Sequence, residues 1–352
     1  MRGKRFWPAI GLFFLSPLVA EYLLGNLPIT ALYALVGLAC LYGGGAVLIR
    51  ELVRRQGWGY PSLLVLALAY GVFEEGVTTQ SLFNPNYVDQ RLLDPGYIHF
   101  LGMGAPWTLF VLSLHTIWSI AVPIVLVEAV SKRPREPWLG KIGTWVVGMF
   151  FLAGAVATTA IQLHNDPFRA SPWQFAGVAV AIAGLVVWAV LLGRGGSVIG
   201  RRVPGVGAVG TAPVGTAPGV WVVGVSALVV SSGFLVVSDL ALPGWWAAAI
   251  YLVIWAGSVW IVRRWALWSR RQVLALASGA LLTYAWHGFP ETPVLAASKT
   301  ADLVGNGIFA GLALVLLVVA WRRVGVVTPA AETAAAGATV DATIRCDKFG
   351  DS

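Results

Sequence analysis

Long apolar runs alternate with short polar segments along most of the chain. A helix needs about 20 mainly apolar residues to cross the hydrocarbon core of a bilayer, within a range of about 17 to 25. About ten runs have this length, so the pattern predicts about ten transmembrane helices. The predicted spans cover residues 7–24, 28–49, 61–82, 107–130, 142–163, 173–193, 219–238, 243–262, 272–288 and 304–321.

The composition agrees with a membrane protein. Of the 352 residues, 58% are hydrophobic and 11% are charged. A soluble domain carries about 25% charged residues, so this chain has too few to cover a water-facing surface. We therefore predict an all-α fold, a polytopic bundle of transmembrane helices in contact with the lipid bilayer. The net charge is +8, but the basic residues lie in short clusters between apolar runs, which argues against a nucleic-acid partner.

The positions of the basic residues also predict the orientation. Lysine and arginine are enriched in the cytoplasmic loops of membrane proteins. With the N-terminus in the cytoplasm, only Arg91, Arg169 and Lys299 of the 24 basic residues fall in predicted outer loops. We therefore expect both termini in the cytoplasm and a multi-pass protein of the plasma membrane. Glu128, at the cytoplasmic end of its span, is expected to form a surface ion pair with Lys132.

A segment rich in glycine and proline divides the predicted spans into two groups. Residues 194–218 contain the stretch TAPVGTAPG, which is typical of a flexible linker. The linker separates a six-span membrane module, residues 1–193, from a four-span module, residues 219–323. The tail, residues 324–352, is rich in alanine and glycine with scattered charges, and we predict that it is disordered.

Two adjacent carboxylates, Glu74 and Glu75, interrupt the third predicted span. A charged side chain at the centre of a bilayer costs about 2.5–3.5 kcal/mol on insertion scales, and such residues usually face the protein interior and mark a functional site. A purely structural role, with protonated acids bonded to neighbouring helices, is the alternative. Successive side chains on an α-helix point about 100° apart, so we expect only one of the two to face a given partner.

His115, on the next span, is the predicted partner of the glutamates. It lies eight residues after the start of its span, and Glu74 lies eight residues before the end of its own. At about 1.5 Å per residue, both side chains are expected about 12 Å below the outer ends of two neighbouring antiparallel helices. Ser119 and Pro123 follow His115 on the same helix. Because Pro123 has no N–H group, the Ser119 carbonyl is predicted to lack its helical donor.

The order Glu74–Glu75, His115, His164–Asn165 resembles the CPBP family of CAAX prenyl proteases and bacteriocin-processing proteins. That family carries a double glutamate on one span, a histidine on the next, and a histidine with a nearby asparagine on a later span. By this resemblance, Glu74 or Glu75 would activate a water for attack on a peptide bond, and His115 would orient the glutamate or share its proton. His164 and Asn165 would stabilise the oxyanion.

The resemblance covers about residues 60–170, and the chain differs from the family pattern at three places. Thr79 stands where the family has arginine, and Val111 stands where it has phenylalanine. Asn165 follows His164 directly, whereas the family has three residues between the two.

Three functions are therefore open. The first is a membrane-embedded peptidase that uses glutamate and histidine on a peptide or protein substrate. The second is a transporter in which Glu74, Glu75 and His115 bind a proton or a cation, and the third is a non-catalytic membrane scaffold. The chain has no P-loop, GxGxxG, CxxC or HExxH motif, which argues against nucleotide, dinucleotide and ordinary zinc-protease chemistry. The sequence leaves open a metal ion held by Glu75, His115 and His164, although their spacing gives no metal signal.

Overall fold

The computed structural model describes residues 6–199, 218–240, 242–264 and 268–325, and these are almost entirely helical. Each predicted span corresponds to a helical segment, which confirms the all-α fold. The predicted linker lies mostly outside the described residues, although the helix before it continues to Ile199. The predicted tail lies outside them from residue 326 onward.

Helices of three kinds build the first four spans. The first span consists of α1 (Trp7–Pro17) and η1 (Leu18–Leu23), and the second of η2 (Ile29–Ala34), α2 (Leu35–Leu38), η3 (Ala39–Gly43) and α3 (Gly44–Arg55). The third consists of α4 (Tyr60–Phe73) and η4 (Glu74–Thr78), and the fourth of α5 (Ala105–Leu114), η6 (His115–Ala121) and α6 (Val122–Val130). The segments η1, η3, η4 and η6 are π-helical, whereas η2 is a 3₁₀-helix. The other six spans are continuous α-helices: α7 (Lys141–Asn165), α8 (Pro172–Ile199), α9 (Val220–Asp239), α10 (Gly244–Arg264), α11 (Arg270–His287) and α12 (Lys299–Gly325).

Within the described residues, eight of these segments are long and apolar enough to cross a membrane. The N-terminal helix, Trp7–Leu23, is apolar but shorter. The helix α11 is more polar than the eight, and many of its side chains are buried.

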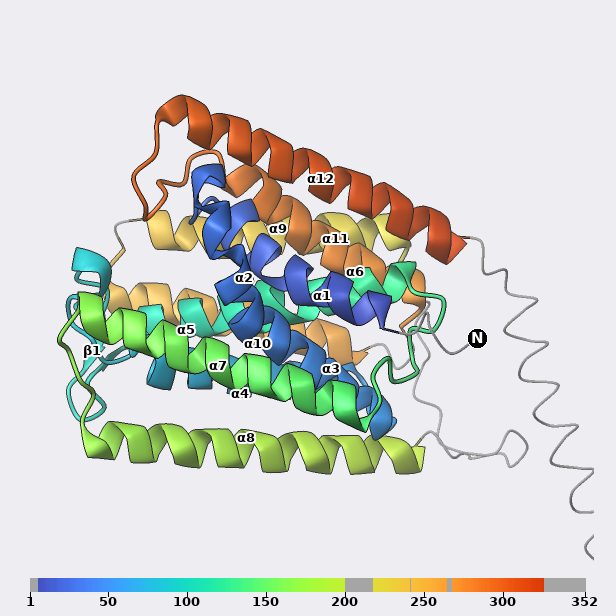
Figure 1. Cartoon of the computed structure of the whole chain (residues 1–352), viewed down its shortest axis with the longest axis horizontal. Coiled ribbons are helices and arrows are strands. Elements are labelled where there is room, and N and C mark those ends of the chain that lie inside the picture. The colour runs from blue at the N-terminus through green and yellow to red at the C-terminus, as the bar shows by residue number, and fades with distance from the viewer. Residues whose placement is uncertain (1–5, 200–217, 241, 265–267, 326–352) are drawn as a thin grey trace, which may run out of the picture.

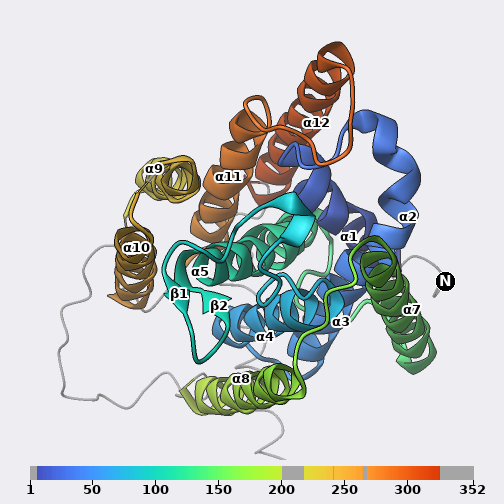
Figure 2. The same cartoon turned by 90° about the vertical axis from the view of Figure 1, so that its left-hand side faces the viewer.

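The helices lie side by side along one common direction, with α8 at one edge and α12 at the other (Figure 1). Viewed from one end, α7, α8, α9, α10 and α12 surround the more central α1, α3, α4, α5 and α11 (Figure 2). The outer helices expose many apolar side chains, such as Trp145 on α7 and Trp173 on α8. A bilayer would cover this apolar surface.

Both predicted modules contribute to one buried core. Trp118 on η6 stacks on Tyr284 of α11, with ring centroids 4.6 Å apart. The Trp118 indole also donates a hydrogen bond of 2.7 Å to the Ala280 carbonyl. Phe234 and Tyr251, from α9 and α10, belong to the same cluster. The two groups of spans therefore pack together as one bundle.

A long connection follows η4 at the predicted outer end. It contains a 3₁₀ turn, η5 (Tyr87–Asp89), and a short antiparallel hairpin of β1 (Tyr97–Ile98) and β2 (Met103–Gly104). Leu82, Phe83 and Leu93 are buried, so parts of this connection pack against the helices rather than extend away from them.

Three consecutive glycines on the second span allow close contacts between helices. A Cβ atom on Gly43 would lie 1.9 Å from the carbonyl oxygen of Phe13 on α1. A Cβ on Gly44 would lie 3.0 Å from the Phe151 side chain, and one on Gly45 would lie 2.5 Å from the Tyr70 ring. The backbone of this span therefore approaches its neighbours more closely than any side chain would allow.

The substitution Gly43→Ala is expected to destabilise the bundle by about 1–3 kcal/mol, because the new methyl group would force α1 away from η3. Gly37→Ala on α2 is the matched control, since nothing lies within 4 Å of its Cβ position. Thermal unfolding of the purified protein in detergent, followed by circular dichroism, should show a lower midpoint for Gly43→Ala alone. Equal midpoints for the two variants would contradict the close packing at Gly43.

The predicted cytoplasmic end contains a buried network of charges. Glu128 on α6 accepts hydrogen bonds of 2.7 Å from both Nε and Nη2 of Arg54, and one of 3.1 Å from Nε of Arg50. Arg50 has no solvent exposure, and it also contacts Glu51 at 2.8 Å. The expected surface pair between Glu128 and Lys132 was therefore wrong, because α3 places two arginines closer to the carboxylate.

Candidate functional site

Five polar residues of the predicted outer half lie on the four π-helical segments. Glu21 is on η1, Tyr42 on η3, Glu74 and Glu75 on η4, and His115 begins η6. A π-turn is rare, and such turns inside α-helices are frequent at functional sites. Here four of them meet around one cluster, so the irregular backbone coincides with the unusual side chains.

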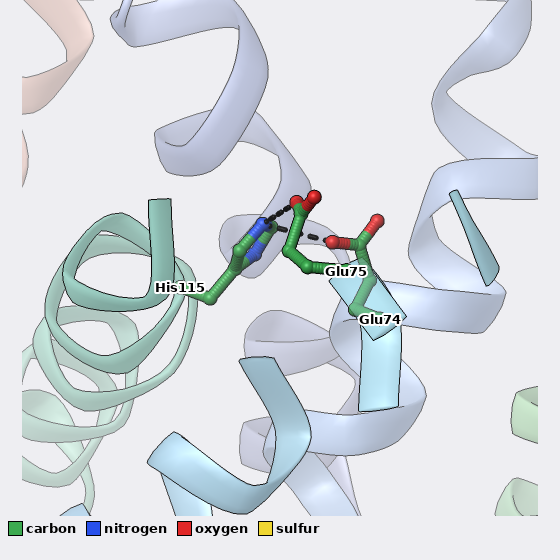
Figure 3. Close-up of side chains that lie close together, drawn as sticks. All are labelled: Glu74, Glu75 and His115. Atoms are coloured by element: carbon green, nitrogen blue, oxygen red, sulfur yellow. Dashed lines mark hydrogen bonds and ion pairs between the residues drawn. The ribbon is translucent and has the colours of Figure 1, made fainter. Parts of the chain in front are cut away.

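Glu74, Glu75 and His115 converge on one point (Figure 3). The Nε2 atom of His115 lies 2.5 Å from Oε1 of Glu75 and 2.8 Å from Oε2 of Glu74. All three residues are buried. Close packing brings the helices together here, because a Cβ atom on Gly71 would lie 3.1 Å from the His115 side chain. The predicted contact between His115 and the glutamates is thus confirmed.

Two details of that prediction were wrong. Both carboxylates reach the same nitrogen, although an ideal α-helix would direct them about 100° apart. The glutamates lie in a π-turn, whose i→i+5 hydrogen bonds widen the turn and reduce the angle between successive side chains. The helix also ends at Thr78 rather than at residue 82, and Gln80 has a positive φ of 58°. Glu74 therefore lies nearer the end of its helix than expected.

The two carboxylates differ in their hydrogen bonds. Oε2 of Glu75 accepts a hydrogen bond of 3.0 Å from Thr79 and a short one from the Ser81 hydroxyl. The Trp107 indole donates to the same hydroxyl at 3.2 Å. The one proton on His115 Nε2 can serve only one carboxylate, and the hydrogen bond goes to Glu75. Oε2 of Glu74, although close to the imidazole, has no hydrogen-bond partner among the described residues.

Neighbouring side chains fix the orientation of the imidazole. The Ser119 hydroxyl lies 3.3 Å from Nδ1 of His115, and the Tyr42 ring stacks on the imidazole with centroids 5.7 Å apart. The predicted free carbonyl of Ser119 accepts a hydrogen bond of 2.5 Å from the Ser16 hydroxyl. Because Pro123 has no N–H group, the Ser119 carbonyl can accept this hydrogen bond from Ser16 on α1.

The cluster extends towards the end of the first span. The Tyr42 hydroxyl donates a hydrogen bond of 2.5 Å to Glu21, and the amide of Asn26 donates one of 2.5 Å to the other oxygen of Glu21. Tyr87, in the loop after η4, lies close enough to these carboxylates to interact with them electrostatically. Burial raises the pKa of the Tyr87 phenol well above its usual value, and the carboxylates of Glu75, Glu74 and Glu21 raise it further.

His164 and Asn165 do not belong to the cluster. Both are exposed at the end of α7, and His164 is absent from the group of converging side chains. The neighbouring Asp166 instead accepts a hydrogen bond of 2.5 Å from Asn84. His287 also lies elsewhere, 3.7 Å from Asp239 and therefore outside the Glu–His group.

The converging atoms are of the kinds that bind metal ions. One ligand atom each from Glu74, Glu75 and His115 lies within 4.8 Å of the other two. Carboxylate oxygens with an imidazole nitrogen suit zinc and other divalent transition metals. A metal at this position would use Glu74 in place of the His164 considered from the sequence.

Sequence reasoning missed the role of Tyr42 and the hydroxyl groups around Glu75. Tyr42 stands immediately before the three glycines, where a ring can approach a neighbouring helix. The predicted span 61–82 includes Thr79 and Ser81 in a regular helix, whereas they follow its last turn and fold back onto the carboxylate. A polar residue beside a glycine run was the available signal for Tyr42.

Comparison with known proteins gives a family but no function. A search of curated proteins and a search of solved structures both find no match. A family model described as an uncharacterized membrane protein family matches residues 12–338, which is most of the chain. Together with the eight apolar helices, this match identifies the chain as a polytopic membrane protein that belongs to that uncharacterized membrane protein family.

Proposed function

We propose that Glu74, Glu75 and His115 form the reactive centre of a membrane-embedded peptidase similar to the CPBP family. The observation that carries the proposal is the convergence of two buried carboxylates on one imidazole nitrogen, with one carboxylate oxygen left without a hydrogen bond. A structural cluster would be expected to satisfy all of its buried polar atoms. Oε2 of Glu74 has no hydrogen bond to a described residue but lies 2.8 Å from the imidazole nitrogen, and in this proposal it binds a water molecule there.

The hydrogen bonds suggest different roles for the two glutamates. Glu75 is already occupied by His115, Thr79 and Ser81, so it holds the imidazole in place. Glu74 is the general base in this proposal. Its carboxylate accepts a proton from water while the water oxygen attacks the peptide carbonyl carbon. The same proton then passes to the amide nitrogen as the C–N bond breaks, which leaves a carboxyl terminus and an amine.

His115 holds Glu74 through their 2.8 Å ion-pair contact, and the positive charge of the protonated imidazole would stabilise the developing oxyanion. His164 and Asn165, which the family resemblance assigns to the oxyanion, have no part in the proposed step because they lie exposed at the end of α7. The Ser119 hydroxyl and the Tyr42 ring hold the imidazole in the required orientation.

The proposal predicts that the purified protein in lipid nanodiscs cuts membrane proteins taken from the expression host. New termini are identified by mass spectrometry after incubation with wild-type protein, with His115→Ala, or with no enzyme. Loss of the imidazole displaces both carboxylates, and a misplacement of about 1 Å can reduce a rate about 100-fold. His287→Ala is the matched control, since that buried histidine lies outside the cluster. Equal cleavage by wild-type and His115→Ala protein would refute the proposal.

A further inference from the structure

A polar cavity lies at the opposite end of the bundle from the Glu–His cluster. It has a volume of about 270 Å³ and lies between the ends of α3, α6 and α12 and the beginnings of α4 and α11. This is the end that the distribution of basic residues predicts to be cytoplasmic. Its charged lining residues are Arg54, Glu128, Arg135 and Arg270.

The charges of this lining do not cancel. Glu128 is matched by the two hydrogen bonds from Arg54, each 2.7 Å long. Arg135 and Arg270 make no salt bridge or side-chain hydrogen bond with any described residue. The cavity therefore presents two arginines with no anionic partner, which is the arrangement that binds phosphate oxygens.

The other walls of the cavity are apolar. They consist of side chains at the ends of the helices, and aromatic rings stand beside them. A lining that combines arginines with apolar side chains suits a molecule that joins a phosphate to hydrocarbon. The apolar residues are Val125, Ala129, Val273, Leu274 and Val324.

We propose that this cavity binds the phosphate group of an anionic membrane lipid, with Arg135 and Arg270 as the two cations. The glycerol and the first part of the acyl chains would lie against the apolar wall. Anionic lipids of the cytoplasmic leaflet lie at this depth, and basic cavities between transmembrane helices bind such headgroups. Free inorganic phosphate offers the same oxygens but gains nothing from the apolar wall.

The test is native mass spectrometry of the full-length protein in detergent, titrated with phosphatidylglycerol, phosphatidylcholine or inorganic phosphate. Each arginine near an anionic headgroup contributes to the binding free energy of the lipid. Loss of both should therefore weaken phosphatidylglycerol binding about 30-fold. The double variant R135Q/R270Q removes both cations of the cavity. The double variant R135K/R270K, which keeps both charges, should retain most of the binding.

The matched control is R133Q/R271Q. It has the same change in net charge and lies on the same two segments, but Arg133 pairs with Glu136 and Arg271 bonds to the Gly325 carbonyl, outside the cavity. Binding of phosphatidylglycerol that only R135Q/R270Q weakens supports the proposal with a lipid as the ligand. Inorganic phosphate that competes equally well supports the same site with free phosphate as the ligand. Equal binding of phosphatidylcholine and phosphatidylglycerol, or equal losses in the two glutamine variants, would overturn it.

Discussion

Glu74→Gln is expected to lower the rate of peptide cleavage by about 10²–10⁴-fold and to leave thermal stability nearly unchanged. The amide has the shape of the carboxylate but cannot accept the proton of the attacking water. Stability is expected to persist because Glu75 makes the hydrogen bond to the imidazole, whereas Oε2 of Glu74 makes only an ion-pair contact of 2.8 Å with it. The measurements are the cleavage rate and the unfolding midpoint of the same purified sample.

Glu75→Gln is the variant to compare with Glu74→Gln. Its amide would place an N–H group against the hydroxyls of Thr79 and Ser81 or against the imidazole of His115. Unsatisfied buried polar groups cost about 1–3 kcal/mol each, so this variant should lose stability as well as activity. A Glu74→Gln protein that melts early, together with a wild-type protein that cleaves nothing, would instead support the scaffold hypothesis.

Glu128→Ala is expected to destabilise the protein by about 3–5 kcal/mol, the largest loss of stability predicted for a single change. The substitution leaves Arg50 and Arg54 buried without the carboxylate that binds both of them. Thermal unfolding in detergent measures the loss. Membrane insertion should be checked by expression level, because an unpaired buried charge can also reduce the yield.

The matched control is Glu136→Ala, whose partner Arg133 is exposed. An exposed ion pair contributes about 0–1 kcal/mol, so this variant should melt close to the wild-type protein. The double variant E128A/R54A should recover part of the loss, since it also removes one of the unpaired charges. Equal midpoints for Glu128→Ala and Glu136→Ala would show that the buried network does not stabilise the bundle.

The helices could be predicted from the sequence because the thickness of a bilayer fixes the length of an apolar run. All of the predicted spans correspond to helical segments. The pairing of His115 with the glutamates also followed from helix rise alone, since neighbouring antiparallel spans bring residues of equal depth together. These predictions depended on the spacing of apolar residues along the chain and on the depth of each residue in the bilayer.

The remaining features depend on contacts that periodicity does not encode. The π-turn at Glu74 changes the direction of both carboxylates, and neither hydropathy nor helical periodicity signals such a turn. Glu128 bonds to Arg54, which is distant in sequence, rather than to the nearby Lys132. His164 was placed near the site by the order of motif residues, yet its position at the exposed end of α7 keeps it outside the cluster.

The most direct test of the proposed peptidase is the incorporation of heavy oxygen from labelled water into new carboxyl termini. Wild-type and Glu74→Gln proteins would be compared at equal amounts of folded protein in nanodiscs. If Glu74 activates the attacking water, label should enter the new termini with the wild-type protein and at least about 100-fold more slowly with Glu74→Gln. Label that enters at the same rate with both proteins, or with neither, would contradict a hydrolytic role for this site.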